Sequence, residues 1–224
     1  MATVLILGAS RGIGMEFARQ YAAEGHRIIA THRKPEAGET LRALGAKPIV
    51  LDMLDEGAVV EFGETMASET IDIAIINAGV AGPRGSALRA PGGLDFDAVM
   101  HTNVRAPMQL IPALSPALIA ARGKLAVVSS KMGSVSLMTS TASWLYRASK
   151  AALNSALKAA SLELGPQGVT CIAFHPGWVR TDMGGGSADI DVQSSVSGMR
   201  RILAAANDSS NGKFINYNGE QLSW

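Results

Sequence analysis

A glycine-rich turn close to the N-terminus restricts the fold of this chain more than any other feature. The apolar run Thr3–Leu7 leads directly into a turn with glycines at its first, fifth and seventh positions, and a helical pattern follows. Glycine allows a tight turn and a close approach of the backbone to a bound group. The first turn of the helix adds unpaired N–H groups and the positive end of its dipole. This order predicts a nucleotide pyrophosphate site, for which we expect as cofactor-binding residues Gly8, Ser10, Arg11, Gly12, Ile13 and Gly14.

Short β-rich runs alternate with helical patterns along the rest of the chain. Continuously apolar runs are typical of strands that are covered on both faces. The expected strands are 3–7, 27–31, 48–52, 71–76, 124–129, 169–174 and 213–217, and the expected helices are 12–24, 35–44, 55–68, 95–121, 144–164 and 191–206. The alternation predicts an α/β Rossmann fold, a doubly wound parallel sheet of about seven strands with helices on both faces. No linker or repeat interrupts residues 1–224, so we expect a single domain.

The composition argues against several other classes of protein. The net charge of +1 gives no field that would attract nucleic acid or an anionic membrane. One cysteine and four scattered histidines do not support a metal site. The apolar run 4–7 is too short for a signal peptide, and the stretch Ala106–Ala121 contains three prolines and is shorter than the roughly 20 residues that span a bilayer. We therefore expect a cytoplasmic protein.

The end of the second expected strand bears on the choice of nucleotide. NAD sites usually place an acidic residue there to bind the ribose 2′-hydroxyl, but this strand is followed by His32-Arg33-Lys34. Arg11 and Arg33 could instead grip a 2′-phosphate, since arginine binds phosphate in a bidentate manner. These residues favour NADP(H) over NAD, although exposed arginines often bind nothing. Asp52, which Met53 follows, either caps a turn or accepts a hydrogen bond from the adenine.

Tyr146 and Lys150 stand four residues apart near the start of an expected helix, so they share one of its faces. A tyrosine with its ordinary pKa of about 10 is a poor acid or base at neutral pH. An ammonium roughly 4 Å away, at an effective dielectric of about 20, favours the phenolate by up to about 4 kcal/mol. We therefore expect Lys150 to lower the pKa of Tyr146 toward neutrality, where proton transfer is most effective. Alone, such a pair is common on helix surfaces.

In combination these motifs resemble the short-chain dehydrogenase/reductase family over the whole chain. The glycine turn and the Tyr146–Lys150 pair match that family, as do Asn77-Ala78-Gly79 after the fourth strand, Ser129-Ser130 after the fifth, and the nicotinamide-side segment with Pro176, Gly177, Val179 and Thr181. The stretches 146–154, 176–185 and 212–224 are similar to sniffer-type carbonyl reductases and C-factor signalling proteins. The resemblance implies transfer of a hydride between NADP(H) and a carbonyl/alcohol pair on a small molecule, by a homodimer or homotetramer.

The resemblance also implies catalytic roles. Tyr146 would donate the proton, Lys150 would lower its pKa and hold the nicotinamide ribose, Ser130 would orient the carbonyl, and Asn103 would bind a relay water. The residue four positions after Asn103 is Pro107, which has no N–H, so the Asn103 carbonyl loses its usual helical donor and is free for that water. The alternative is a simple proline kink.

Three features depart from the family pattern. Leu7 and Ile76 replace a threonine and an asparagine, and we expect both changes to affect support of the turn and sheet. The family serine stands about thirteen residues before the tyrosine, whereas Ser130 precedes Tyr146 by sixteen and Ser134 by twelve. We favour Ser130 because it directly follows a strand, and such sheets bind ligands at the carboxyl ends of their strands. The segments 131–145 and 182–198 then form the substrate pocket.

Several other residues have a more ordinary interpretation. We expect His175 to be structural, Cys171 to be a small core residue, and Met132, Met138 and Met183 to make the pocket mouth apolar. The run 184–187 indicates either a lid hinge or a flexible loop. A nucleotide-binding regulatory protein of the C-factor kind, with little turnover, is the alternative function, although it has no use for a Tyr–Lys pair. A methyltransferase leaves that pair equally unexplained.

Overall fold

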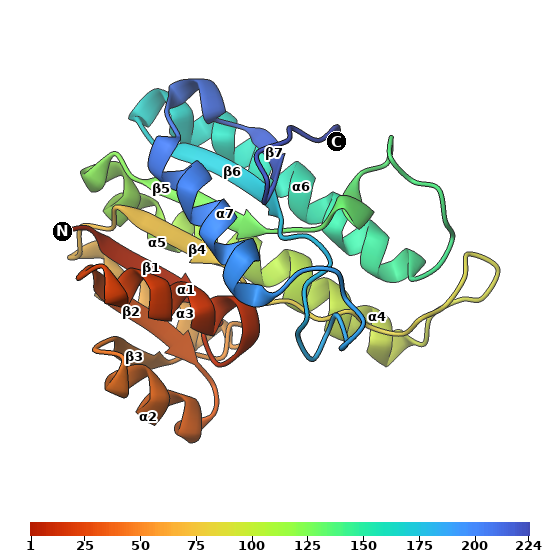
Figure 1. Ribbon diagram of the computed structural model, residues 1–224, viewed down its shortest axis with the longest axis horizontal. Helices are drawn as coiled ribbons and strands as arrows, with labels where there is room; N and C mark the ends of the chain where they lie inside the picture. The colour runs from red at the N-terminus through yellow and green to blue at the C-terminus, as the bar shows by residue number, and fades with distance from the viewer.

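The computed structural model describes residues 1–224 and contains one seven-stranded parallel sheet (Figure 1). The strands are β1 Thr3–Leu7, β2 Arg27–His32, β3 Lys47–Val50, β4 Ile73–Ile76, β5 Lys124–Val128, β6 Thr170–His175 and β7 Lys213–Asn216. Their order, β3-β2-β1-β4-β5-β6-β7, reverses direction between β1 and β4. At such a switch point the loops that follow the two strands diverge to opposite faces and leave a crevice at the carboxyl edge. The predicted doubly wound fold is confirmed.

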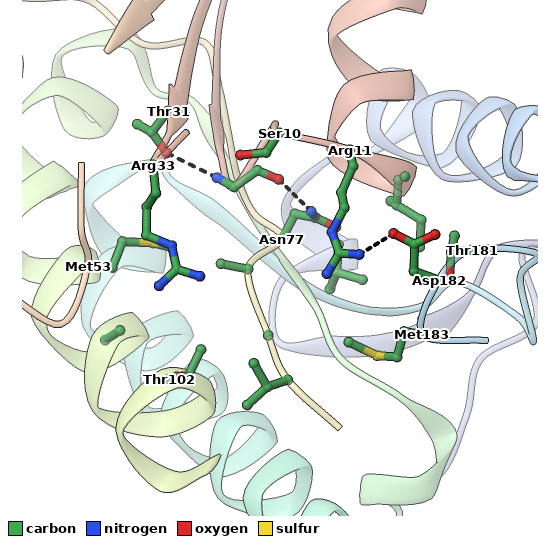
Figure 2. A pocket seen from close by; sticks show the side chains of 18 of the residues that line it. Ser10, Arg11, Thr31, Arg33, Met53, Asn77, Thr102, Thr181, Asp182 and Met183 are labelled. Carbon is green, nitrogen blue, oxygen red and sulfur yellow. Dashed lines mark hydrogen bonds and ion pairs between the residues drawn. The ribbon is translucent and has the colours of Figure 1, made fainter. Parts of the chain in front are cut away.

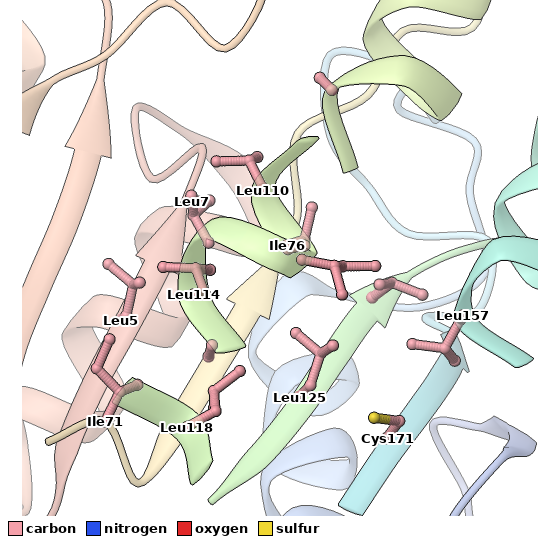
Figure 3. Close-up of a cluster of buried hydrophobic side chains, with 14 of the residues drawn as sticks. Leu5, Leu7, Ile71, Ile76, Leu110, Leu114, Leu118, Leu125, Leu157 and Cys171 are labelled. Carbon is pink, nitrogen blue, oxygen red and sulfur yellow. The ribbon is translucent and has the colours of Figure 1, made fainter. Parts of the chain in front are cut away.

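Helices cover both faces of the sheet, because side chains along each strand alternate between two cores. Leu5 and Leu7 of β1 belong to one core, and Val4 and Ile6 to the other. The first core packs against α3 Glu56–Ala67, α5 Ala106–Ala121 and α6 Trp144–Leu164, and Figure 3 shows leucines of α5 lying across the strands. The second core packs against α1 Gly12–Ala23, α2 Pro35–Ala43 and α7 Val192–Ala205.

Polar side chains bond to the first turns of α3 and α7 and to the last turn of α7. The Asp55 and Asp191 carboxylates accept hydrogen bonds from the backbone of the first turns of α3 and α7. Such N-caps typically contribute about 1 kcal/mol each. At the other end of α7, the Lys124 ammonium of β5 donates to the Leu203 carbonyl at 2.6 Å. A lysine is favourable there because it meets the negative end of the helix dipole.

The long helix expected at 95–121 is interrupted. It consists of α4 Gly93–Met100, a π-helical turn η1 His101–Arg105, and α5. The N–H of Ala106 donates to the carbonyl of His101, five residues back, instead of to Thr102. Pro107 has no N–H and cannot restore the α-helical pattern at the next position. The proline therefore coincides with a wider turn that contains Asn103.

The same helical run, Gly93–Ala121, is long and apolar enough to cross a membrane by length and composition alone, with a mean hydropathy of 1.2 over its best window. The core helix of a soluble protein can pass the same test. In this fold α5 buries Leu110, Leu114 and Leu118 completely against the sheet.

Candidate active site

A cleft of about 480 Å³ opens at the carboxyl edge of the sheet, where β1 and β4 diverge. Most of the predicted site residues line it, namely Gly8, Ser10, Arg11, Gly12, Ile13, Arg33, Asp52, Met53, Asn77, Ala78, Gly79, Tyr146, Lys150, Pro176 and Thr181. Five predicted residues are not part of this lining: Gly14, Asn103, Ser130, Gly177 and Val179. The sequence reasoning missed a further set of lining residues, among them Thr31, Val80, Thr102, Val128 and Arg180.

The glycine turn is held by the two neighbouring strands. Gly8 has a φ of +87°, its N–H donates to the Thr31 hydroxyl at 3.0 Å, and its carbonyl accepts from the Asn77 amide at 2.8 Å. A Cβ on Gly14 would lie 2.1 Å from the Gly8 carbonyl oxygen, so only glycine fits there. Gly14 thus shapes the turn from behind. Leu7 is fully buried in the core, so Thr31 and Asn77, rather than a threonine in the turn, provide the support.

The three residues His32, Arg33 and Lys34 at the end of β2 have different surroundings. Arg33 is exposed, points into the cleft and has no acidic partner (Figure 2). His32 is buried, its Nδ1 lies 2.8 Å from the Lys34 carbonyl, and its ring packs against Gly38. Of the three, Arg33 is therefore the side chain free to meet an anion in the cleft. The Asp52 carboxylate accepts a hydrogen bond from the Leu54 N–H at 3.1 Å, so it caps a turn, which is one of the two roles expected for it.

Arg11, the second predicted phosphate-binding residue, forms an ion pair with Asp182 (Figure 2). Both side chains are largely exposed. The pair joins the glycine turn to the segment after β6, and Thr181 of that segment also packs beside Gly12. The two walls of the cleft are thereby in direct contact, a relationship between distant segments that the sequence does not indicate.

Helix α6 carries Tyr146 and Lys150 on one face, as predicted. The Lys150 ammonium is buried, donates to the Val128 carbonyl at 3.0 Å, and lies 5.7 Å from the centre of the Tyr146 ring. Burial raises the pKa of Tyr146 to about 12, opposed in part by a hydrogen bond with Ser130. Burial also lowers the pKa of Lys150 to about 8.

The expectation that Lys150 brings the phenol pKa close to neutrality is therefore wrong for this arrangement. The ammonium is held by a backbone carbonyl instead of by the phenol oxygen, and loss of hydration outweighs its attraction for a phenolate. At pH 7 Tyr146 keeps its proton, and Lys150 is mostly charged. The phenol of Tyr146 therefore carries a proton that it can donate, and the positive charge of Lys150 lies next to the Tyr146 ring.

The structure separates the two candidate serines. The Ser130 hydroxyl is next to the phenol, whose pKa it lowers, and it accepts from the Met132 N–H at 3.1 Å. The Ser134 hydroxyl instead accepts from the Leu137 N–H at 3.2 Å and lies 3.2 Å from the Ser136 hydroxyl. Ser134 is thus engaged within its own loop, and Ser130 is the serine beside Tyr146.

Asn103 is fully buried, and its side chain has a structural role. Its amide oxygen accepts from the Val80 N–H and its amide nitrogen donates to the Val80 carbonyl, both at 2.8 Å, and the nitrogen also donates to Ser149 at 3.0 Å. These bonds join η1 to the segment after β4 and to α6. In the backbone, the Asn103 carbonyl has no α-helical donor, because Pro107, four residues later, has no N–H. The Thr102 carbonyl also lacks its α-helical donor, because the Ala106 N–H donates to the His101 carbonyl.

The segment after β6 is tightly hydrogen-bonded. The Trp178 indole donates to the Gly184 carbonyl at 2.8 Å, and the Gly184 N–H donates to the Thr181 hydroxyl at 3.1 Å. A Cβ on Gly184 would lie 2.0 Å from the Val179 carbonyl oxygen. Gly184 is therefore required by close packing, which supports neither a hinge nor a flexible loop at that position. The Gly177 backbone, with a φ of +87°, turns the chain toward the cleft.

Two remaining groups have strongly shifted pKa values. His175 is buried with its Nδ1 unpaired, and burial together with the nearby Lys131 charge lowers its pKa to about 4. Burial raises the pKa of the Cys171 thiol to about 12. A neutral imidazole and a protonated thiol agree with the structural roles expected of both residues. No three His, Cys, Asp or Glu side chains come together as a metal site would require.

The chain belongs to the short chain dehydrogenase family, whose model matches residues 2–191. It is 36% identical over 167 residues to C-signal of Myxococcus xanthus, which covers 73% of this chain and 98% of C-signal. Carbonyl reductase Sniffer of D. melanogaster is similar over the full length of both chains, with a TM-score of 0.91 and 28% identity. A carbonyl reductase from Pseudomonas aeruginosa PAO1 in complex with NADP also covers both chains fully, with a TM-score of 0.87 and 33% identity. The family resemblance stated from the sequence is confirmed, and the chain is an oxidoreductase of that family.

Proposed function

We propose that this protein is an NADP(H)-dependent carbonyl reductase that also oxidises the corresponding alcohols. The observation that carries the proposal is the grouping of Tyr146, Ser130 and Lys150 beside a cleft whose glycine turn leaves room for a nucleotide backbone. A regulatory protein that only binds nucleotide needs the cleft but not the three polar groups. The grouping therefore favours turnover over the C-signal type of function.

The cleft fits NADP(H) in its shape and its charge. Gly8 and Gly79 line the cleft, and their missing Cβ atoms allow close packing on Ala78 and Asn103. The helix α1 begins at Gly12 with its N–H groups free for a pyrophosphate. Arg33 projects into the adenosine end, and no acidic residue follows β2 to bind a 2′-hydroxyl. The NADP-bound relative supports the same choice of cofactor.

When bound, NADPH would supply the hydride for the carbonyl carbon of the substrate, and the protein's own residues would supply the proton. Ser130 donates a hydrogen bond to the carbonyl oxygen and holds it next to the phenol. Tyr146, which is protonated at pH 7, gives its proton to that oxygen as negative charge develops there. The Lys150 ammonium then stabilises the phenolate until the phenolate takes a proton from water. The Asn103 side chain holds η1 and α6 together beside Tyr146 and Lys150. The backbone carbonyls of Asn103 and Thr102 are acceptors for a water that passes a proton to the phenolate.

The reaction is tested by following NADPH and NADH oxidation with a panel of ketones, aldehydes and quinones. Tyr146→Phe should lower kcat by about 10²–10⁴-fold, the usual contribution of general acid–base catalysis. Equal rates in the two proteins would remove Tyr146 from the mechanism. Tight NADPH binding without turnover of any compound would support the regulatory function in its place.

We also propose that the protein acts in the cytoplasm as a homodimer or homotetramer. Met108 on α5 and Leu162 on α6 are exposed apolar residues on the two longest helices, which we propose form the contact. Sedimentation of the wild type and of Leu162→Glu would test this, since a charge in a buried interface should dissociate the assembly.

A further inference from the structure

The loop between Ser130 and Tyr146 leaves the sheet at one proposed catalytic residue and returns at another, although none of its own residues lines the cleft described above. It lies at the carboxyl edge of the sheet, at the right of Figure 1. No charged residue occurs between Lys131 and Arg147. Three apolar side chains of the loop are exposed, namely Val135, Leu137 and Met138. Apart from Lys131 at its start, the loop is therefore able to offer a substrate apolar contacts and hydroxyl groups.

The start of the loop is anchored to helix α6. Gly133 packs so closely on the Lys150 backbone that a Cβ would lie 2.6 Å from the Lys150 carbonyl carbon. The Ser129 hydroxyl donates to the Asn154 side chain at 2.6 Å, and the Asn154 amide donates to the Gly133 carbonyl at 3.4 Å. These contacts hold Ser130 against Tyr146 without help from the rest of the loop.

The next part of the loop is anchored to a different part of the chain, the residues after β7. The Ser136 hydroxyl donates to the Trp224 carbonyl at 2.9 Å, and the Ser136 N–H donates to the same oxygen at 3.3 Å. The Trp224 ring stacks on Phe214 of β7, with ring centroids 5.4 Å apart, and Phe214 is fully buried in the core. The Leu222 N–H donates to the Phe214 carbonyl at 2.8 Å, which folds residues 222–224 back along the sheet edge.

We propose that Trp224 is a positioning residue that holds this loop through Ser136, and that the exposed apolar side chains of the loop form one wall of the substrate site. This inference rests on the proposed reductase function. Tyr146, Ser130 and Lys150 are anchored separately, so loosening the wall weakens substrate binding and leaves the chemical step intact. The effect is therefore specific to KM and grows with the apolar size of the substrate.

The kinetic test uses a series of 2-ketones of increasing chain length with saturating NADPH. In the wild type KM should fall as the chain lengthens, because each added methylene is buried against the wall. Trp224→Ala should abolish most of that fall, raise KM for the longest ketone by about tenfold and change kcat by less than about twofold. Trp224→Phe keeps a ring on Phe214 and should restore the trend. Ser136→Ala, which keeps the backbone bond, should show a smaller effect in the same direction.

A control separates positioning from loss of stability. Met66→Ala removes a buried side chain of α3, far from the loop in the fold, and should destabilise the protein by about 2–5 kcal/mol without altering the dependence of KM on chain length. If Met66→Ala and Trp224→Ala change KM alike, the positioning role is wrong. A fall in kcat equal to the rise in KM would also overturn it.

A second measurement does not require turnover. The amide hydrogen of Ser136 should exchange slowly in the wild type and much faster in Trp224→Ala, while NADPH binds both proteins equally. Unchanged exchange would overturn the role of Trp224 even in an active enzyme. If the wild type reduces no ketone, the proposed function fails, and the exchange of Ser136 still decides whether Trp224 holds the loop.

Discussion

The ammonium of Lys150 lies 5.7 Å from the ring centre of Tyr146 and bonds to the carbonyl of Val128, while the phenol it was expected to ionise stays protonated. The two side chains share a helix face, but the lysine is oriented by the end of β5. A charge held under the ring in this way favours the phenolate most strongly once the proton has left. The pair therefore suits the direction of carbonyl reduction, in which tyrosine begins as the acid.

The pH dependence of reduction should follow Lys150 instead of Tyr146. The pKa of Lys150 is about 8 and that of Tyr146 about 12, so between these values the lysine loses its charge while the phenol keeps its proton. We expect kcat to be level from pH 6 to about 7.5 and to fall as pH rises through about 8.

Lys150→Arg provides the control for that profile, because a guanidinium stays charged throughout this range. The variant should be slower overall but lack the fall near pH 8. Retention of the same fall in Lys150→Arg would assign it to another group.

His175 should make the protein sensitive to mild acid. Its folded pKa of about 4 lies below the ordinary 6.5, so the unfolded state binds more protons between these values, and stability falls as pH drops from about 6.5 toward 4. The difference corresponds to roughly 3 kcal/mol when fully developed. Urea unfolding at several pH values from 4.5 to 7 should show a steeper loss in the wild type than in His175→Leu. Parallel curves for the two proteins would contradict the prediction.

Arg33 should determine the preference between the two nicotinamide cofactors. It is the cation that points into the cleft without an acidic partner, so Arg33→Ala should weaken NADPH binding by about tenfold or more and leave NADH binding within about twofold. Lys34→Ala is the matched control, since Lys34 lies next in the chain but does not line the cleft. Titration by nicotinamide fluorescence measures the affinities of the wild type and of both variants for the two cofactors. An equal loss for both cofactors would show that Arg33 has no contact with a 2′-phosphate.

Two glycines provide a matched pair for the turn. A Cβ on Gly14 would lie 2.1 Å from the Gly8 carbonyl oxygen, whereas a Cβ on Gly93 meets nothing within 4 Å. Gly14→Ala should destabilise the protein by at least about 2 kcal/mol and weaken nucleotide binding, because the backbone of the turn must move. Gly93→Ala should be neutral or stabilising by up to about 1 kcal/mol. Thermal unfolding and NADPH titration distinguish the two, and similar behaviour would mean that the turn tolerates the shift.

The fold was predictable because most of its strands are buried on both faces. Within a run such as 124–129 only the two end residues, Lys124 and Ser129, are polar, and the structure ends β5 at Val128, one residue earlier than expected. The cleft followed from the same pattern, since the carboxyl ends of parallel strands meet at one edge of a sheet. Thr31 could have been noted as well, because it ends the strand next to the glycine turn.

The remaining features depend on distances that a sequence does not contain. The degree of burial decided the pKa of Tyr146, and nothing near that residue in the chain reveals it. Pro107 signalled a disturbed helix, but whether the helix would bend or widen depended on how Asn103 bonds to Val80. The contacts of Asp182 with Arg11 and of Trp224 with Ser136 join segments far apart in the chain.

The π-helical turn at His101–Arg105 holds one residue more per turn than an α-helix does. Deleting a single residue there would let the helix continue as a regular α-helix, with α4 and α5 in nearly the same orientation, because the wider turn absorbs the extra residue. The amide that joins Val80 to Ser149 would be carried out of place, although the helical content and both cores would hardly change. A circular dichroism spectrum would report an intact protein that had lost the support beneath its reactive tyrosine. Insertions or deletions in this helix should therefore damage activity more than most substitutions. In an engineered variant the number of residues in this turn matters more than which residues they are.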